Sequence, residues 1–386
     1  MKKTKQKMLF TMNRSVICQQ LRKRLSIITL ATFLASLTFL FFTYLDPEAR
    51  AVRGIARLGR PASRPTETSS MFGDVIEALY KPQIHPITAE NFTDETGQVF
   101  RNSGEPFYKK GLGKRVLILD ADTRPMNKDG ELLSSGGMKW PHPDPISSGM
   151  LSHYLYSRIH GYDYQLIQVT RISDWSNTWS KIPAIKHALM SYDLVVFLDQ
   201  DAVFRYPALP LEWLLNHWRH TNETALLLAA DPDKAFNTDP HGSRYLNTGF
   251  IVAQNSTRTH RLIDAWLRCP FGAEYAGCRR FAHQWPHEQA ALVSFVHRYA
   301  FTRPEDVRAV PCAEANGSPW TAAEHGCRGA LVRHLWRNGK GRQPDELVDQ
   351  VLRYLMPALY SDFRNGYYKT LAMASAPEKT KINRGG

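Results

Sequence analysis

Asp193 to Phe204 reads DLVVFLDQDAVF, and the rest of the chain is organised around this stretch. Its apolar part, Leu194–Leu198, contains two adjacent valines and ends abruptly at Asp199-Gln200-Asp201. A short apolar run bounded by charge is typical of a strand that is buried on both faces of a sheet. Asp199 and Asp201 then follow at the carboxyl end of the strand, where open α/β sheets bind their ligands.

Two carboxylates separated by one residue suit a shared divalent cation. Hard cations prefer oxygen ligands, and a bound cation can in turn hold a diphosphate. The D-x-D pattern alone also fits a simpler interpretation, in which Asp199 caps the next turn and Asp201 is solvated. The surrounding sequence has to decide between them.

Strands and helices alternate over residues 114–201. The expected elements are, in order, a strand at 116–119, a loop rich in Gly, Pro and Ser at 123–148, a helix at 149–160, a strand at 164–169 and a helix at 178–191. This alternation indicates an α/β fold with a parallel, nucleotide-binding type of sheet. Asp120, at the end of the first strand, is a candidate contact for a nucleotide donor.

The second half of the chain is less regular. Helices are expected at 209–217, 257–267 and 288–299, and strands at 225–230, 245–253 and 331–336. Gly249 interrupts the strand at 245–253, and a glycine there often marks the close approach of backbone or ligand. Glu288 at the start of a helix is explained by the helix dipole alone. A lone histidine such as His334 is more often structural than a ligand.

The N-terminal part predicts a membrane anchor. Leu25–Leu45 carries no charge and, at ~1.5 Å rise per residue, spans the ~30 Å apolar core of a bilayer. A cleaved signal peptide is the alternative, but the segment is long and ends in Phe-Phe-Thr-Tyr rather than in small residues. The stronger cationic flank precedes the span, so residues 1–24 are expected in the cytosol. We expect a single-pass type II protein whose body lies outside the cytosol.

The net charge of +13 does not indicate a nucleic-acid partner. Residues 1–24 carry eight of these positive charges and no acid, and arginines add more over 46–65, so the body is close to neutral. The expected organisation is a cytosolic tail (1–24), a signal-anchor (25–45), a partly disordered stem (46–113), a catalytic domain (114–365) and a polar tail (366–386). Within the stem, a short helix is expected at 71–80.

Sequons and cysteines agree with a secretory route. Asn-x-Ser/Thr sequons in the body are candidate N-glycosylation sites, at Asn91, Asn222, Asn255 and Asn316. The body also holds four cysteines, an even and clustered set that suits disulfides in an oxidising compartment. We expect two local bridges, Cys269–Cys278 and Cys312–Cys327. A zinc site is the alternative, and the lack of a C-x-x-C pair argues against it.

Six segments in a fixed order resemble glycosyltransferase family 34, which includes fungal α-galactosyl- and α-mannosyltransferases and plant xyloglucan xylosyltransferases. The segments are IHGYDYQLI, WSKIPAIKHAL, VVFLDQDAVF, LNTGFIVAQNS, EQAAL and VRHLW. The resemblance covers roughly residues 114–340. It implies a Rossmann-like GT-A fold, a nucleotide-sugar donor, Mn²⁺ or another divalent cation, and transfer with retention of configuration. The anchor and stem are likewise similar to those of Golgi membrane enzymes of this group.

The resemblance also assigns roles to individual residues. Asp199, Asp201 and His334 match the metal ligands, and Glu288 and Gln289 match an acidic/amide pair at the transfer centre. Other matches to donor- and acceptor-binding positions are Lys181, Asn247, Thr248 and Gly249. One departure matters, because the sequence after His334 is Leu-Trp-Arg rather than the family's F-x-G-C-like ending. Arg337 and Lys340 are therefore the candidates for the cationic diphosphate partner.

The implied function is transfer of a hexose, galactose or mannose, to a glycan or glycoprotein acceptor, within a Golgi transferase complex. Two mechanisms fit: a front-face transfer in which Gln289 or Glu288 stabilises the sugar cation, and a double displacement with Glu288 as nucleophile. Two other functions stay open. One is an inactive, membrane-anchored carbohydrate-binding relative. The other is a phosphatase, because D-x-D-x-V at 199–203 also resembles the first motif of haloacid-dehalogenase phosphatases.

Overall fold

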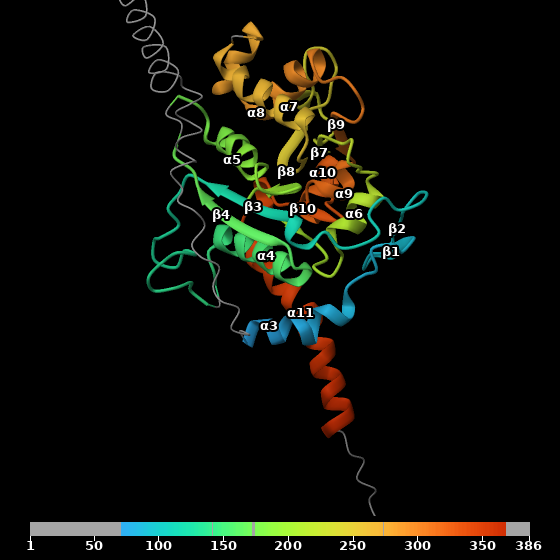
Figure 1. Ribbon diagram of the computed structural model, residues 1–386. Helices are drawn as coiled ribbons and strands as arrows, with labels where there is room; N and C mark the ends of the chain where they lie inside the picture. Colours follow the sequence, from blue (N-terminus) through green and yellow to red (C-terminus); the bar gives the residue numbers. More distant parts are fainter. Residues whose placement is uncertain (1–70, 141, 172–173, 273, 368–386) are drawn as a thin grey trace, which may run out of the picture.

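The structure is a computed structural model that describes residues 71–140, 142–171, 174–272 and 274–367. Its centre is a six-stranded sheet with helices on both faces (Figure 1). The strands, in their order across the sheet, are β4 (Asp163–Gln168), β3 (Val116–Asp122), β5 (Leu194–Leu198), β8 (Leu246–Gln254), β7 (Leu226–Ala230) and β9 (Val307–Val310). The chain thus has the α/β fold that the sequence predicted.

The sheet is mixed rather than wholly parallel. β3 pairs in parallel with both β4 and β5, which confirms the arrangement predicted for residues 114–201. β8 runs antiparallel between β5 and β7, and β9 returns parallel to β7. The sequence did not predict β9, since its four residues, VRAV, are too few to show a period.

Side chains of alternate strand residues enter two separate cores. In β5, Val195 and Phe197 point into one core, whereas Leu194, Val196 and Leu198 point into the other. The helices that cover the first face are α5 (Lys181–Ala188), α7 (Thr257–Arg268) and α8 (Glu288–Ala291, continued by a π-helical turn over Leu292–His297). Those on the second are α4 (Pro145–His160) and α6 (Leu211–His217). All of β5 is buried, as its sequence indicated.

A small two-stranded sheet lies beyond the end of β5. It pairs β6 (Ala202–Phe204) with β10 (Val332–His334) in antiparallel register, so that His334 faces Ala202. Short helices α9 (Cys312–Ala315) and α10 (Pro319–His325) lead into β10. This pairing carries the late histidine back to the D-x-D segment.

Residues 71–113 differ from the partly disordered stem that the sequence predicted. They form helix α3 (Met71–Val75) with a further helical turn to Tyr80, and a hairpin of β1 (Asn91–Thr93) and β2 (Val99–Arg101). Ile76, Tyr80, Phe100 and Tyr108 are buried against the domain. The helical turns over 71–80 confirm the short helix expected there. The hairpin was not predicted, because its apolar residues are too few and too irregularly spaced to show a strand pattern.

A long C-terminal helix, α11 (Gln343–Asp362), was also not predicted. It packs on α4 and extends away from the body (Figure 1). Within the described residues no helix is both long and apolar enough to cross a membrane. The predicted tail and signal-anchor, residues 1–45, lie outside the described part, as do residues 46–70 of the stem and 368–386 of the tail.

Both predicted disulfides, Cys269–Cys278 and Cys312–Cys327, are present. The sequons behave differently from one another. Asn91, Asn222 and Asn255 are exposed, whereas Asn316 is fully buried. Its Nδ2, the atom that a glycan would occupy, donates a hydrogen bond to the carbonyl of Ala230 at 3.1 Å. The prediction that Asn316 carries a glycan is therefore wrong for the folded protein.

Candidate active site

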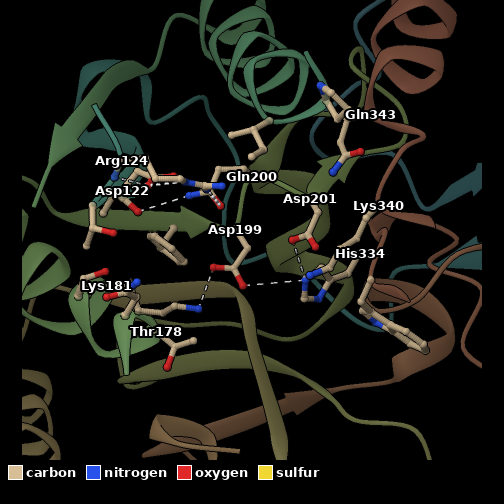
Figure 2. A pocket seen from close by; sticks show the side chains of 18 of the residues that line it. Asp122, Arg124, Thr178, Lys181, Asp199, Gln200, Asp201, His334, Lys340 and Gln343 are labelled. Carbon is tan, nitrogen blue, oxygen red and sulfur yellow. Dashed lines mark hydrogen bonds and ion pairs between the residues drawn. The ribbon is translucent and has the colours of Figure 1, made fainter. Parts of the chain in front are cut away.

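The three predicted metal ligands meet at the carboxyl end of β5. Asp199 and Asp201 directly follow that strand, and the β6–β10 pairing brings His334 beside them (Figure 2). Nε2 of His334 lies 3.2 Å from Oδ1 of Asp201 and 3.9 Å from Oδ2 of Asp199. One ligand atom from each residue lies within 4.8 Å of the others.

This donor set fits a divalent cation. In octahedral coordination with bonds of about 2.1 Å, neighbouring ligands lie about 3 Å apart and opposite ones about 4 Å apart. The measured separations fall close to that range without rearrangement. Two carboxylates and one imidazole suit a borderline ion such as Mn²⁺.

Gly249 explains how the histidine approaches so closely. A Cβ atom at this position would lie 2.2 Å from Cε1 of His334, so any larger residue would displace the ring. The backbone carbonyl of Gly249 also accepts a hydrogen bond from the Asp199 amide at 2.8 Å. The register of β8 against β7 shifts at this point, between Leu228 and Ala229. The glycine in the strand thus marks a close approach, as predicted.

Charges around the cluster are paired. Nζ of Lys181, a buried residue, donates a hydrogen bond to Oδ1 of Asp199 at 2.8 Å. Burial would lower the pKa of Lys181, but Asp199 and Glu288 raise it above its usual value. Burial raises the pKa of Asp199 despite the opposing charge of Lys181, and Asp201 adds to the rise. Burial alone would raise the pKa of Asp201 too, but the adjacent His334 lowers it to about 2.

A cavity of about 680 Å³ opens over the cluster. Its polar lining includes Asp122 and Arg124, which form an ion pair at 2.6 Å, together with Lys181 and Lys340 (Figure 2). Asp120 is not among the lining residues. It is fully buried, where it accepts a hydrogen bond from Tyr164 at 2.7 Å and pairs with His153 at 2.9 Å. The structure therefore corrects the prediction that Asp120 contacts the donor, because only Asp122, two residues further along β3, lines the cavity.

A second cavity of about 500 Å³ lies on the other side of His334. The two cavities share His334, Trp336 and Lys340. Arg337 lines only the second, with its guanidinium 5.8 Å from the Phe236 ring centre. Of the two candidate diphosphate partners, Lys340 thus borders the first cavity and Arg337 does not.

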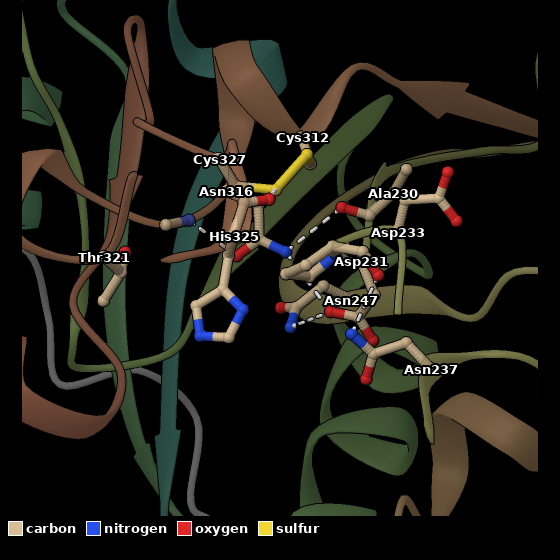
Figure 3. Close-up of a disulfide and its surroundings, with 12 residues drawn as sticks. Ala230, Asp231, Asp233, Asn237, Asn247, Cys312, Asn316, Thr321, His325 and Cys327 are labelled. Atoms are coloured by element: carbon tan, nitrogen blue, oxygen red, sulfur yellow. Dashed lines mark hydrogen bonds between the residues drawn. A yellow bond between two sulfur atoms is a disulfide. The ribbon is translucent and has the colours of Figure 1, made fainter. Parts of the chain in front are cut away.

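Asp231 organises the wall of the second cavity. Its carboxylate accepts hydrogen bonds from Asn247 at 2.9 Å, Gln289 at 2.9 Å and Asn316 at 3.3 Å. Figure 3 shows Asn316 beside the Cys312–Cys327 disulfide, with its amide directed at Ala230 and Asp231. Burial raises the pKa of Asp231, although these three amides oppose the rise. Sequence reasoning missed both Asp231 and the structural role of Asn316, and the only signal was that Asp231 ends a strand.

The predicted catalytic pair is divided between two environments. Gln289 lines the second cavity, whereas Glu288 lines neither cavity and is 2% exposed. Glu288 accepts a hydrogen bond from Thr248 Oγ1 at 2.7 Å and lies 3.6 Å from Lys181 Nζ. Thr248 is itself buried, and its amide donates to Gln289 Oε1 at 3.2 Å. The geometry therefore places Gln289 at the open site and Glu288 behind it.

The fold and the polar cavity at the strand ends place this chain among the α/β proteins that bind ligands at this edge of the sheet. A family model for the galactosyl transferase GMA12/MNN10 family matches residues 150–304. This match supports the resemblance to a divergent member of that family that the sequence predicted. This agreement favours the transferase over the phosphatase interpretation.

Several plant proteins match part of the chain. Xyloglucan 6-xylosyltransferase 1 of Arabidopsis thaliana is 28% identical over 152 residues, which are 36% of this chain and 31% of that protein. Xyloglucan 6-xylosyltransferase 2 of the same plant is 26% identical over the same shares. The match thus spans about a third of the length of these relatives.

Solved structures give looser similarities. A glycosyltransferase involved in glycosylation of the PBCV-1 major capsid aligns with a TM-score of 0.42 and 14% identity, over 60% of this chain and 98% of that one. The galactosyltransferase LgtC aligns with a TM-score of 0.35 and 12% identity, over 62% of this chain and 96% of that one. Mouse xyloside xylosyltransferase 1 aligns with a TM-score of 0.36 and 11% identity, over 59% of this chain and 99% of that one.

Proposed function

We propose that this protein is a metal-dependent glycosyltransferase of GT-A fold that moves a hexose from a nucleotide sugar to a glycan acceptor. The observation that carries the proposal is the cluster of Asp199, Asp201 and His334 at the base of the first cavity. A divalent cation held there would act as a Lewis acid toward the diphosphate of the donor. The family match over residues 150–304 supports the same class of reaction.

The first cavity suits the donor. Lys340 stands at its junction with the second cavity, so its ammonium can stabilise the charge that develops on the leaving phosphate. Lys181 holds Asp199 through its hydrogen bond and is itself fixed by the carbonyl of Thr248 at 3.1 Å. These contacts keep the Asp199 carboxylate oriented before the donor binds.

The second cavity suits the acceptor. Gln289 lines this cavity, and its amide group is held by Asp231 and by the backbone amide of Thr248. It is placed to stabilise the positive sugar in a front-face transfer with retention. Glu288, the nucleophile that a double displacement requires, is buried behind Thr248 and Lys181. The geometry thus supports the front-face mechanism.

The proposed setting is a type II Golgi membrane protein, with residues 25–45 as the anchor and the described domain in the lumen. Its support is the uncharged segment in the sequence, the two disulfides and three exposed sequons. UDP-galactose and GDP-mannose are the leading donors. Association with other transferases in a complex belongs to the same proposal.

The test is a donor screen with the full-length chain and Mn²⁺. Release of nucleoside diphosphate is measured for a panel of UDP- and GDP-sugars, with and without oligosaccharides. We expect release from one donor, abolished by a chelator and by Asp199→Ala. If no donor is consumed by folded protein that binds Mn²⁺, the transferase proposal fails and the inactive carbohydrate-binding relative takes its place.

A further inference from the structure

Two exposed aromatic side chains form a ridge at the outer edge of the second cavity. Phe236 is 49% exposed and Trp285 is 56% exposed, and their ring centres lie 6.4 Å apart with the planes inclined at 48°. Exposing two large apolar side chains together costs free energy unless a ligand covers them. We call this pair the aromatic ridge.

A third cavity, of about 390 Å³, begins on the far side of the aromatic ridge. Phe236 and Trp285 line both the second and the third cavity. The first and second cavities already share His334, Trp336 and Lys340. The three cavities therefore lie next to one another, in an order that leads from the metal ligands, through the second cavity, to the ridge.

The chemistry of this path matches a chain of sugars. A pyranose ring has an apolar face of C–H groups, which packs on an aromatic ring, and hydroxyl groups around its edge. Polar side chains flank the ridge on both sides to meet such hydroxyls. Arg337 and Asn247 lie on the inner side, and Arg280 and Gln284 on the outer side. Both cavities have the volume of ordinary ligand sites.

We propose that the aromatic ridge binds the acceptor sugar next to the one that is modified. This inference rests on the proposed function, because the reacting sugar has to lie in the second cavity beside Gln289. The next sugar then reaches the ridge, and a third extends into the outer cavity. The ridge would thus select acceptors by length, a property that the metal cluster cannot supply.

Binding of defined glycans tests the ridge without a donor. Cellotetraose and α-1,6-linked mannotetraose are titrated into the full-length chain by calorimetry. Each is compared with the methyl glycoside of its single sugar, glucose or mannose. At least one tetrasaccharide should bind at least ten times more tightly than its methyl glycoside. Trp285→Ala and Phe236→Ala should each weaken that binding about tenfold, and Trp285→Phe, which keeps a ring, should restore most of it.

The matched control is Tyr299→Ala, which removes an aromatic side chain of similar exposure, 59%, from outside the three cavities. It should leave tetrasaccharide binding unchanged. The inference is overturned if neither tetrasaccharide binds better than its methyl glycoside, or if both ridge variants bind as the parent does.

The ridge and the transferase can fail separately. Donor hydrolysis without an acceptor reports on the first cavity alone. Donor hydrolysis together with no preference for tetrasaccharides would contradict the proposed role of the ridge and support the proposed transferase activity. Tetrasaccharide binding that depends on Trp285, together with no hydrolysis of any donor, would support the proposed role of the ridge and contradict the proposed transferase activity.

Discussion

The first and second cavities meet at His334 but are built from different materials. The wall of the first is charged and its charges are paired, as in Lys181 with Asp199 and Arg124 with Asp122. The wall of the second has amides arranged around one buried carboxylate, Asp231, and opens onto the aromatic ridge. Paired charges suit a charged diphosphate, and amides with aromatics suit a neutral sugar. The contrast suggests that donor and acceptor are recognised by separate physical means.

Neutralising a metal ligand should have the largest effect. Asp201→Asn keeps the shape of the side chain but removes one negative charge from the cluster, so Mn²⁺ affinity should fall at least tenfold. Nucleoside diphosphate release and sugar transfer should both fall by about 10³. Calorimetric Mn²⁺ titration and both activity assays measure this.

The matched control is Asp129→Asn, an exposed carboxylate that pairs with Lys139 and lines neither cavity. It should retain both activities and the metal affinity. Equal losses in the two variants would show that Asp201 has no special role.

Variants of Lys340 and Arg337, the two cationic residues near the junction of the cavities, should have different effects on donor hydrolysis and acceptor binding. Lys340→Ala should lower donor hydrolysis about 10²-fold, because it removes positive charge beside the leaving phosphate. Arg337→Ala should raise the acceptor KM several-fold and change hydrolysis less, since Arg337 lines only the second cavity. Steady-state kinetics with donor and acceptor varied in turn provide the measurement. The reverse pattern would exchange the roles of the two cavities.

A buried histidine makes the fold less stable at low pH, so the two cavities should be compared near neutral pH. His220 is fully buried, its Nδ1 shares a hydrogen bond with the Tyr108 hydroxyl at 2.8 Å, and burial lowers its pKa to about 3. The unfolded chain takes up this proton near pH 6.5, so the contribution of neutral His220 to stability is lost as pH falls from 6.5 toward 3. At pH 5 the loss is about 2 kcal/mol.

Denaturant unfolding between pH 7 and 5 measures this loss. His220→Phe cannot take up the proton in either state, so its unfolding free energy should change less with pH than that of the parent. His241→Phe, at an exposed position, should keep the parent's slope. If His220→Phe shows the parent's slope as well, other groups dominate the acid response.

Much of the fold was readable because its elements carry regular patterns. β5 reads as five consecutive apolar residues and α7 repeats its apolar residues with a helical period. α11 was missed although it is long, because five of its twenty residues are buried and its other apolar residues face outward. The ordered structure of residues 84–113 was missed because single apolar side chains, such as Phe100 and Tyr108, anchor irregular backbone.

The site was readable where residue type alone limits the chemistry. The D-x-D spacing pointed to a cation site, but His334 was assigned to it only through the family resemblance. Access to the cavities was not readable. Asp120 and Asp122 share one face of β3, but only Asp122, at the end of the strand, lines a cavity. Glu288 and Gln289 are adjacent, but only Gln289 lines a cavity. Asn316 shows the opposite case, a pattern that matches a sequon while its side chain supports the wall around Asp231.

The pairing of β6 with β10 joins positions more than a hundred residues apart in the chain. During synthesis the two aspartates leave the ribosome long before the histidine, so the growing chain holds an incomplete set of ligands. A cation that needs all three cannot be captured until β10 has added to β6, which is among the last long-range contacts that the chain can make. Metal capture would therefore report that the chain has been translated and folded as far as β10, and a polypeptide that ends before residue 334 would carry the D-x-D motif without the site.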